Sequence, residues 1–151
     1  MNKAEIKIRK LKRSDVNHVY NVSHRIKEFT VSDRIHFYEK KEMVEWIGKK
    51  DSVFLVAEVE KRIVWFIFCK IISKEWAMLD SLEVDQEFRS QGIGTKLVNA
   101  LFDELNQKHI TFVQAFVGKN YKKSRKFWKE CGFIEGKEFI WVDKILRKKR
   151  K

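Results

Sequence analysis

Polar and apolar side chains alternate at the start of the chain and then recur at helical spacing. Residues 5–10 show the period of two that is typical of a half-buried strand. Ser14-Asp15 can cap a helix that runs on to Ser23, and residues 37–50 predict a second helix that Gly48 helps to end. Two helices are therefore expected after the first strand.

Three stretches rich in Val, Ile, Phe and Trp follow these helices. Residues 52–60 and 62–72 predict two strands, and the Glu60-Lys61 junction between them is short enough for an antiparallel hairpin. Residues 76–84 predict a fourth strand.

The second half of the chain alternates between helical and extended patterns. An amphipathic helix is expected from Ile93, a fifth strand over 110–117, and a short helix with an apolar stripe over 121–131. Residues 133–145 are expected to supply the last one or two strands, broken near Gly136-Lys137.

The resulting order is β-α-α-β-β-β-α-β-α-β-β, a mixed α/β (α+β) fold in a single domain over residues 1–151. The sequence contains no repeat and no linker that would divide it. Residues 144–151 are mostly basic and are expected to form a frayed tail.

Composition narrows the class of protein. Hydrophobic residues make up 44% of the 151 residues and charged residues 36%, which excludes a disordered or fibrous chain. No apolar run is long enough to cross a bilayer, and the N-terminus does not resemble an export signal, so a cytoplasmic protein is expected. The two cysteines and four histidines form no ligand pattern, and no metal is expected.

The net charge of +12 favours anionic partners such as nucleotides, phosphorylated cofactors, nucleic acid or acidic proteins. Charge alone does not choose among them.

The segment from Leu82 to Leu97 carries the candidate chemistry. A strand leads through a short turn into a helix whose first turn contains Gly92 and Gly94, so unpaired backbone N–H groups and the positive end of the helix dipole face one point. Arg89 adds a charged donor nearby. The spacing fits neither a P-loop nor a Rossmann glycine motif, and a pyrophosphate would fit this anion cradle.

The hexapeptide Arg89-Ser90-Gln91-Gly92-Ile93-Gly94 resembles the [Q/R]-x-x-G-x-[G/A] signature of the GNAT superfamily, the acetyl-CoA-dependent N-acetyltransferases. Residues 6–15 resemble the first strand and helix entry of that family, and residues 127–133 resemble its F-Y-x-x-x-G-F segment. The element order is also the GNAT order, in which a mostly antiparallel sheet is splayed between strands four and five.

The resemblance implies a set of residues that contact acetyl-CoA. The main chain around Glu83, at Leu82 and Val84, would pair with the pantetheine arm, and residues 89–95 would hold the pyrophosphate. The full set implied or left open is Leu82, Glu83, Val84, Arg89, Ser90, Gln91, Gly92, Ile93, Gly94, Thr95, Asn120, Tyr121 and Trp128.

Two positions depart from the family pattern. The usual Tyr, a proposed general acid for the departing thiolate, is Trp128 here, whose indole N–H can donate a hydrogen bond but is not an acid near neutral pH. The thiolate is a tolerable leaving group, so transfer need not depend on that acid. The family's cofactor-contacting Asn falls on Tyr121, with Asn120 one residue earlier, and either could touch CoA.

A protonated amine must lose a proton before it attacks a thioester. Asp80 and Glu83 are the carboxylates of the fourth strand; strict alternation would place them on opposite faces, and Glu83 is slightly favoured because it lies closer to the cradle. Glu28 and Asp33 could instead contact a cationic acceptor.

The expected function is acetyl transfer from acetyl-CoA to a primary amine by direct attack, in a monomer or homodimer. The acceptor could be a small molecule, a polyamine, a protein N-terminus or a lysine. The alternative is a weak or inactive module that binds RNA or an acidic protein, and it is motivated by the net charge of +12 and by Trp128 at the family's tyrosine position. Residues 119–129 interleave basic and aromatic side chains, which is better explained by a solvated helix face than by contact with RNA or the ribosome.

Overall fold

The computed structural model describes residues 5–25, 38–84, 88–144 and 146, with the backbone alone for residues 81–84. Its elements in chain order are β1 (Ile6–Lys10), a 3-10 turn η1 (Arg13–Asp15), α1 (Val16–Ser23), α2 (Lys40–Trp46), β2 (Ser52–Val59), β3 (Arg62–Ile71), β4 (Trp76–Val84), α3 (Ile93–Gln107), β5 (Phe112–Ala115) and α4 (Lys122–Glu130).

The sheet follows the chain order, β1-β2-β3-β4-β5. The first three pairings are antiparallel and the last, β4 with β5, is parallel, with α3 as the crossover. Glu60 and Lys61 both have positive φ angles, 49° and 66°, as a two-residue type I′ hairpin turn requires. The predicted hairpin is confirmed.

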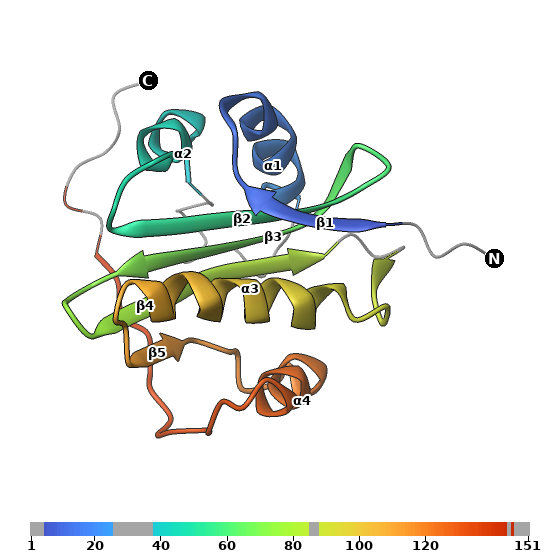
Figure 1. The fold of residues 1–151 in the computed structure, drawn as a ribbon. Coiled ribbons are helices and arrows are strands. Elements are labelled where there is room, and N and C mark those ends of the chain that lie inside the picture. The colour runs from blue at the N-terminus through green and yellow to red at the C-terminus, as the bar shows by residue number, and fades with distance from the viewer. Residues whose placement is uncertain (1–4, 26–37, 85–87, 145, 147–151) are drawn as a thin grey trace.

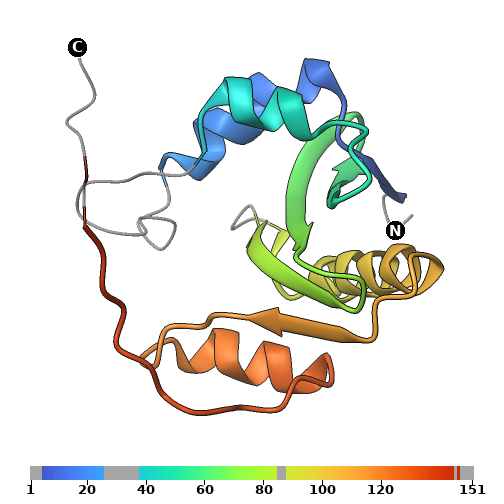
Figure 2. The ribbon, with the colours of Figure 1, turned by 90° about the vertical axis from the view of Figure 1, so that its left-hand side faces the viewer.

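Two apolar layers cover the two faces of the sheet. One lies between the sheet and α3 and includes Ile67 and Leu101; the other lies under α1 and α2 and includes Met43 and Phe68. Figures 1 and 2 show α1 and α2 together on one side of the sheet and α3 on the other, with α4 beyond β5. The mixed α/β architecture is confirmed.

Two details of the prediction are wrong. Helix α2 is shorter than the expected 37–50, because Ile47 is already extended and Gly48 is left-handed with φ of 78°; residue 37 lies outside the described residues. The strands expected over 133–145 are not formed within residues 133–144. No backbone hydrogen bond joins residues 134–144 to another described residue, and an extended segment without such a partner is not a strand.

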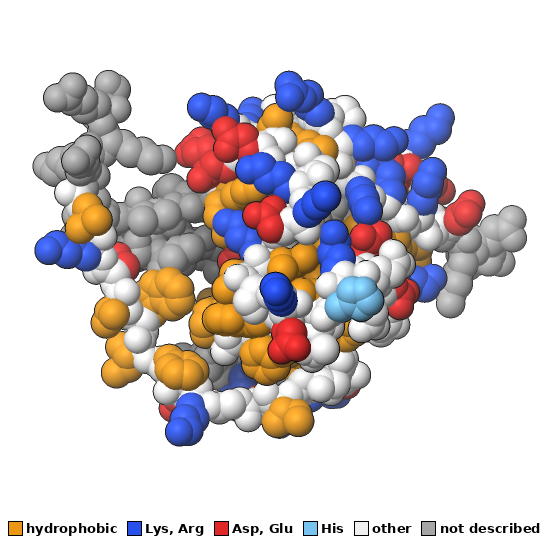
Figure 3. All heavy atoms as spheres, turned by 60° about the vertical axis from the view of Figure 1, so that its left-hand side comes forward, with side chains coloured by type: hydrophobic (Ala, Val, Ile, Leu, Met, Phe, Trp, Pro, Cys, Tyr) orange, Lys and Arg blue, Asp and Glu red, His pale blue; other side chains and the backbone are white. Residues whose placement is uncertain are grey.

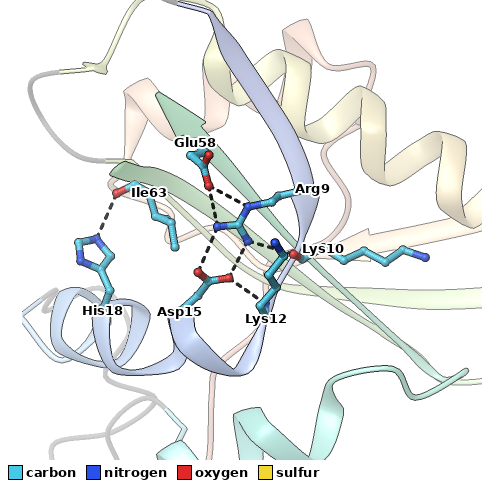
Figure 4. Close-up of polar contacts among 7 residues, drawn as sticks. All are labelled: Arg9, Lys10, Lys12, Asp15, His18, Glu58 and Ile63. Carbon is cyan, nitrogen blue, oxygen red and sulfur yellow. Dashed lines mark hydrogen bonds and ion pairs between the residues drawn. The ribbon is translucent and has the colours of Figure 1, made fainter. Parts of the chain in front are cut away.

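A partly buried ionic network ties β1, η1 and β2 together (Figure 4). The guanidinium of Arg9 donates to both carboxylate oxygens of Asp15, at 2.6 and 3.1 Å, and through Nε and Nη2 to Oε2 of Glu58, at 2.9 and 2.7 Å. The backbone N–H of Lys12 also donates to Asp15. Burial alone would raise the pKa of Asp15, but these hydrogen bonds outweigh it, and the pKa lies below its usual value.

Replacing Asp15 by Asn is expected to lower the free energy of unfolding at neutral pH by about 2–3 kcal/mol, because Arg9 loses one of its two charged partners in a largely buried site. A lowered carboxyl pKa adds stability above the unfolded-state pKa of about 3.9, and this contribution disappears as pH falls through the folded-state value. Urea denaturation should therefore show the gap between wild type and Asp15→Asn closing below about pH 4. A gap that is independent of pH would contradict this account.

Candidate active site at the splayed end of the sheet

Helix α3 begins at a left-handed glycine. Gly92 is the N-cap residue, with φ of 75°, and Ser90 before it also has a positive φ of 63°. The first intrahelical hydrogen bond runs from the N–H of Lys96 to the carbonyl of Gly92, at 3.1 Å. The N–H groups of residues 93–95 thus have no acceptor within the helix, and they lie at the positive end of a 15-residue helix.

The two glycines of this turn have different roles. A Cβ on Gly92 would meet nothing within 4 Å, so this glycine is required for its backbone conformation and leaves the approach to the helix open. A Cβ on Gly94 would collide with the ring of Trp65, with Cη2 at 2.6 Å, and would crowd Phe127 at 3.2 Å. Gly94 therefore allows α3 to pack closely against β3 and α4.

Strands β4 and β5 separate after four residue pairs. The pairing ends at Leu79 and Ala115, whereas β4 continues to Val84 with no described partner on that side. Figure 2 shows β5 diverging from the rest of the sheet. The implied splay between strands four and five is confirmed. It leaves the end of β4 without a partner on this side among the described residues.

A β-bulge lies at the point of separation. Phe68 pairs with Ser81 and Cys69 pairs with Leu79, so Asp80 is an extra residue on β4. The argument from strict alternation, which placed Asp80 and Glu83 on opposite faces, fails at this bulge. The sequence holds only a partial signal of this insertion. Ala77 and Leu79 are two residues apart, as are Leu82 and Val84, whereas Leu79 and Leu82 are three apart, but the apolar Trp76 and Met78 obscure the pattern.

The carboxyl group of Asp80 has a raised pKa although its side chain is exposed. Water reaches its side chain, yet the surrounding protein weakens the hydration of the charged form and raises the pKa to about 6. The other shifted carboxyl groups among the described residues, Asp15 and Glu135, have lowered pKa values. A solvent-accessible group with a pKa near 6 can exchange protons close to neutral pH.

Other predicted carboxylates fall outside the described residues. Residue 83 pairs with Phe66, whose ring packs under α1 and α2, but the side chain of Glu83 is not described. Glu28 and Asp33 also lie outside the described residues.

The turn before α4 contains both candidates for the CoA-contacting position. Tyr121 is the N-cap of α4 and is 48% exposed, and its ring lies where a Cβ on Gly118 would be. Asn120 is exposed, and its carbonyl accepts a hydrogen bond from the N–H of Lys122 at 3.0 Å. Which of the two contacts CoA stays a prediction.

Trp128 packs within an aromatic cluster, and whether it contacts CoA stays a prediction. Its ring makes edge contacts with Phe127 and Phe133, with centroids 5.1 and 5.0 Å apart, and it is partly buried against the α3 layer. Phe127 joins it on the inner side of α4, whereas Tyr121 and Ser124 of the predicted stripe are exposed. The indole offers no acid at the usual tyrosine position.

Within the described ranges, no three His, Cys, Asp or Glu residues lie close enough together to hold a metal ion. None of the described helices is long and apolar enough to span a membrane.

Comparison with known proteins gives a match to a family model and to a curated relative. The model of the acetyltransferase (GNAT) family matches residues 18–133. An uncharacterised N-acetyltransferase of Methanocaldococcus jannaschii is 31% identical over 125 residues, which cover 74% of this chain and 55% of that protein. The chain thus spans about half the length of this curated relative.

Solved structures share the fold at low sequence identity. The aminoglycoside N-acetyltransferase AAC(6')-Iy in complex with CoA has a TM-score of 0.77 at 16% identity, covering 95% of this chain and 97% of that one. The ribosomal-protein-S18-alanine N-acetyltransferase of Escherichia coli has a TM-score of 0.71 at 17% identity, covering 88% and 80%. The family match over residues 18–133, more than half of the chain, shows that the chain belongs to the GNAT family of acetyltransferases.

Proposed function

We propose that this protein transfers the acetyl group of acetyl-CoA to a primary amine. Two features carry the proposal: the edge at the end of β4, which has no partner among the described residues, and the N-terminus of α3, which is capped by a left-handed glycine. An extended amide-containing arm can pair with the first, and a pyrophosphate can bind at the second. CoA contains both groups in one molecule.

The chain's own residues fit this ligand. The N–H groups of residues 93–95 would donate to the pyrophosphate, and Arg89 stands in the turn before them. The main chain at Leu82 and Val84 would pair with the pantetheine arm along the free edge. When bound, acetyl-CoA supplies an activated acyl group and a thiolate leaving group.

The remaining task for the protein is to position the amine and take its proton. We assign proton acceptance to Asp80, because it stands at the bulge where β4 and β5 part, is reached by water and has a pKa near 6. It would accept a proton from the ammonium group, directly or through water, and so generate the neutral amine. Glu83, the carboxylate that the sequence slightly favoured, is the alternative acceptor.

The thiolate would depart without a proton from a general acid at position 128, where the family usually has a tyrosine. Trp128 cannot give up its indole proton near neutral pH and is held in an aromatic cluster. A thiol pKa of about 8.5 makes the thiolate stable enough to depart and take a proton from water. Direct attack on the thioester needs no covalent enzyme intermediate.

The acceptor class is a primary amine. The structural neighbours act on chemically different amines: one is an aminoglycoside N-acetyltransferase, and another is a ribosomal-protein-S18-alanine N-acetyltransferase. At 16–17% identity they show the fold and do not choose an acceptor for this chain.

Titration calorimetry with acetyl-CoA tests the proposal, with acetylpantetheine as the matched ligand that lacks the pyrophosphate. We expect acetyl-CoA to bind and acetylpantetheine to bind at least tenfold more weakly, because the α3 cradle would be empty. Thiol release with a panel of amino acids, polyamines, aminoglycosides and peptides then identifies the acceptor. No binding of acetyl-CoA at near-millimolar concentration would overturn the proposal, and salt-dependent RNA binding without thiol release would favour the binding-module alternative.

A further inference from the structure

Lys70, near the end of β3, has its ammonium group among three aromatic rings. Its Nζ lies 4.6 Å from the ring centroid of Trp46, 5.2 Å from that of Tyr38 and 5.9 Å from that of Phe68. The rings also contact one another: Trp46 and Phe68 are stacked with centroids 4.5 Å apart, and Tyr38 makes an edge contact with Trp46 at 4.4 Å. These three rings, the Lys70 cage, fix the position of a cation that a long side chain would otherwise leave mobile.

The Lys70 cage positions this charge without neutralising it. Aromatic rings attract a cation through their quadrupole and carry no net charge of their own. None of the ion pairs among the described residues includes Lys70, whereas Arg9 is paired with two carboxylates and Arg125 with the carboxylate of Glu135. Lys70 is only half-buried, so its ammonium N–H donors remain accessible to an anion from solution.

This fixed charge lies close to the residue that we assign to proton acceptance. Lys70 pairs with Met78 of β4, two residues before Asp80. Leu79 packs in the layer under α3, so the alternation of the strand turns Asp80 toward the other face of the sheet, the face that Phe68 and the Lys70 cage occupy. Two residues of a strand span about 7 Å, a distance that one small molecule can bridge.

We propose that Lys70 binds an anionic group of the acceptor, so that the preferred acceptor is a primary amine that also carries a carboxylate or a phosphate. The inference rests on the proposed acetyl transfer, because it requires the amine to approach Asp80. With the amine at Asp80 and the anionic group at Lys70, two contacts would orient the acceptor for attack on the thioester. Lys70 is thus a specificity-determining residue that keeps its own proton throughout.

The charge of the whole chain favours the same class of acceptor. A net charge of +12 attracts anionic molecules and repels polycations. Figure 3 shows Lys and Arg side chains (blue) spread over one view of the molecule, with hydrophobic side chains (orange) between them. A polyamine or an aminoglycoside would bring further ammonium groups close to Lys70, where like charges repel. This chain should therefore differ in acceptor from the aminoglycoside N-acetyltransferases that share its fold.

Rates of thiol release at saturating acetyl-CoA test the acceptor class. The acceptors form matched pairs, β-alanine with propylamine, phosphoethanolamine with ethanolamine, and an acidic peptide with its amidated counterpart; spermidine and an aminoglycoside represent polycations. We expect kcat/KM to be about tenfold or more higher for the anionic member of a pair, and the comparison of pairs distinguishes carboxylate from phosphate. A polycation or an uncharged amine as the best acceptor would overturn this inference alone. No thiol release with any acceptor, although acetyl-CoA binds, would overturn the proposed transfer as well.

Lys70→Met tests the residue itself, because methionine keeps the apolar contact with the Lys70 cage and removes the charge. KM for the anionic acceptor should rise about tenfold or more while kcat stays nearly unchanged, the pattern of a lost binding contact. KM for the uncharged member of the pair and the affinity for acetyl-CoA should not change. Lys70→Arg, whose guanidinium also packs on aromatic rings and donates to anions, should restore most of the preference.

Lys108→Met is the matched control. Lys108 is also half-buried, its Nζ donates to the carbonyl of Lys50 at 3.2 Å, and it lies at the C-terminal end of α3, away from the cradle. This variant loses the same charge and should keep the wild-type KM for every acceptor. Equal losses in both variants would attribute the preference to net charge and refute the role of Lys70. A lower melting temperature in Lys70→Met with an unchanged ratio of KM values within each pair would show that the Lys70 cage is structural, and would also refute it.

Discussion

Asp80→Asn is expected to lower kcat about a hundredfold or more at neutral pH, the usual effect of losing a general base. The asparagine side chain has nearly the same shape but cannot accept the ammonium proton. In wild type, kcat should fall as pH drops below about 6, because the carboxyl group becomes protonated near its pKa of about 6. The variant should lack this inflection, and its rate should keep rising with pH as free amine becomes available.

The stability of the same variant gives an internal control. A raised carboxyl pKa means that the charged form is disfavoured in the folded protein, so replacing it with a neutral amide should leave the melting temperature unchanged or higher. Acetyl-CoA affinity should also stay close to the wild-type value. If Glu83→Gln produces the loss of kcat and of the pH inflection while Asp80→Asn does not, the proton acceptor is Glu83.

Gly94→Ala is expected to destabilise the fold and weaken acetyl-CoA binding together. The added methyl group would overlap the ring of Trp65 and press on Phe127, so β3, α3 and α4 would have to move apart. Overpacking of this kind costs about 1–3 kcal/mol, which corresponds to several degrees of melting temperature in a domain of this size. Because the same turn is proposed to present its N–H groups to the pyrophosphate, calorimetry should show a matching loss of affinity.

Gly92→Val provides the contrast. A Cβ at this position meets no neighbour, so the stability cost is the left-handed backbone alone, about 1–2 kcal/mol. The side chain would project beside the first turn of α3, where the pyrophosphate is proposed to lie. We expect acetyl-CoA affinity to fall more than stability does in Gly92→Val. Affinity that survives the change would place the pyrophosphate elsewhere.

The strands and most helices could be predicted because each buries one face, and this burial places apolar residues at a regular spacing in the sequence. β4 has the expected bounds, and β2 and β3 differ from the prediction by one residue each. The same pattern misled at residues 133–145, where apolar residues indicated strands. A strand depends on a partner edge as well as on its own residues, and the pattern of one segment contains no information about that edge.

The cradle was predictable for a related reason. Its chemistry comes from the backbone of a strand, a glycine turn and a helix, all of which leave local signals in sequence. The separate role of Gly94 was not visible, because it depends on Trp65, which is distant in sequence. The pKa of Asp80 likewise arises from the packing around a bulge, and a residue's identity alone cannot report it.

The order of the strands in the sheet also bears on how the chain assembles. Each strand from β1 to β4 pairs with its neighbour along the chain, and the β2–β3 and β3–β4 connections are short, so their pairing costs little loop-closure entropy. The parallel pairing of β5 with β4 requires the crossover through α3. Among consecutive paired strands, only β1 and β2 are farther apart in sequence than β4 and β5. During synthesis from the N-terminus, all residues of the four antiparallel strands are made before β5, the strand whose early separation leaves the end of β4 without a described partner.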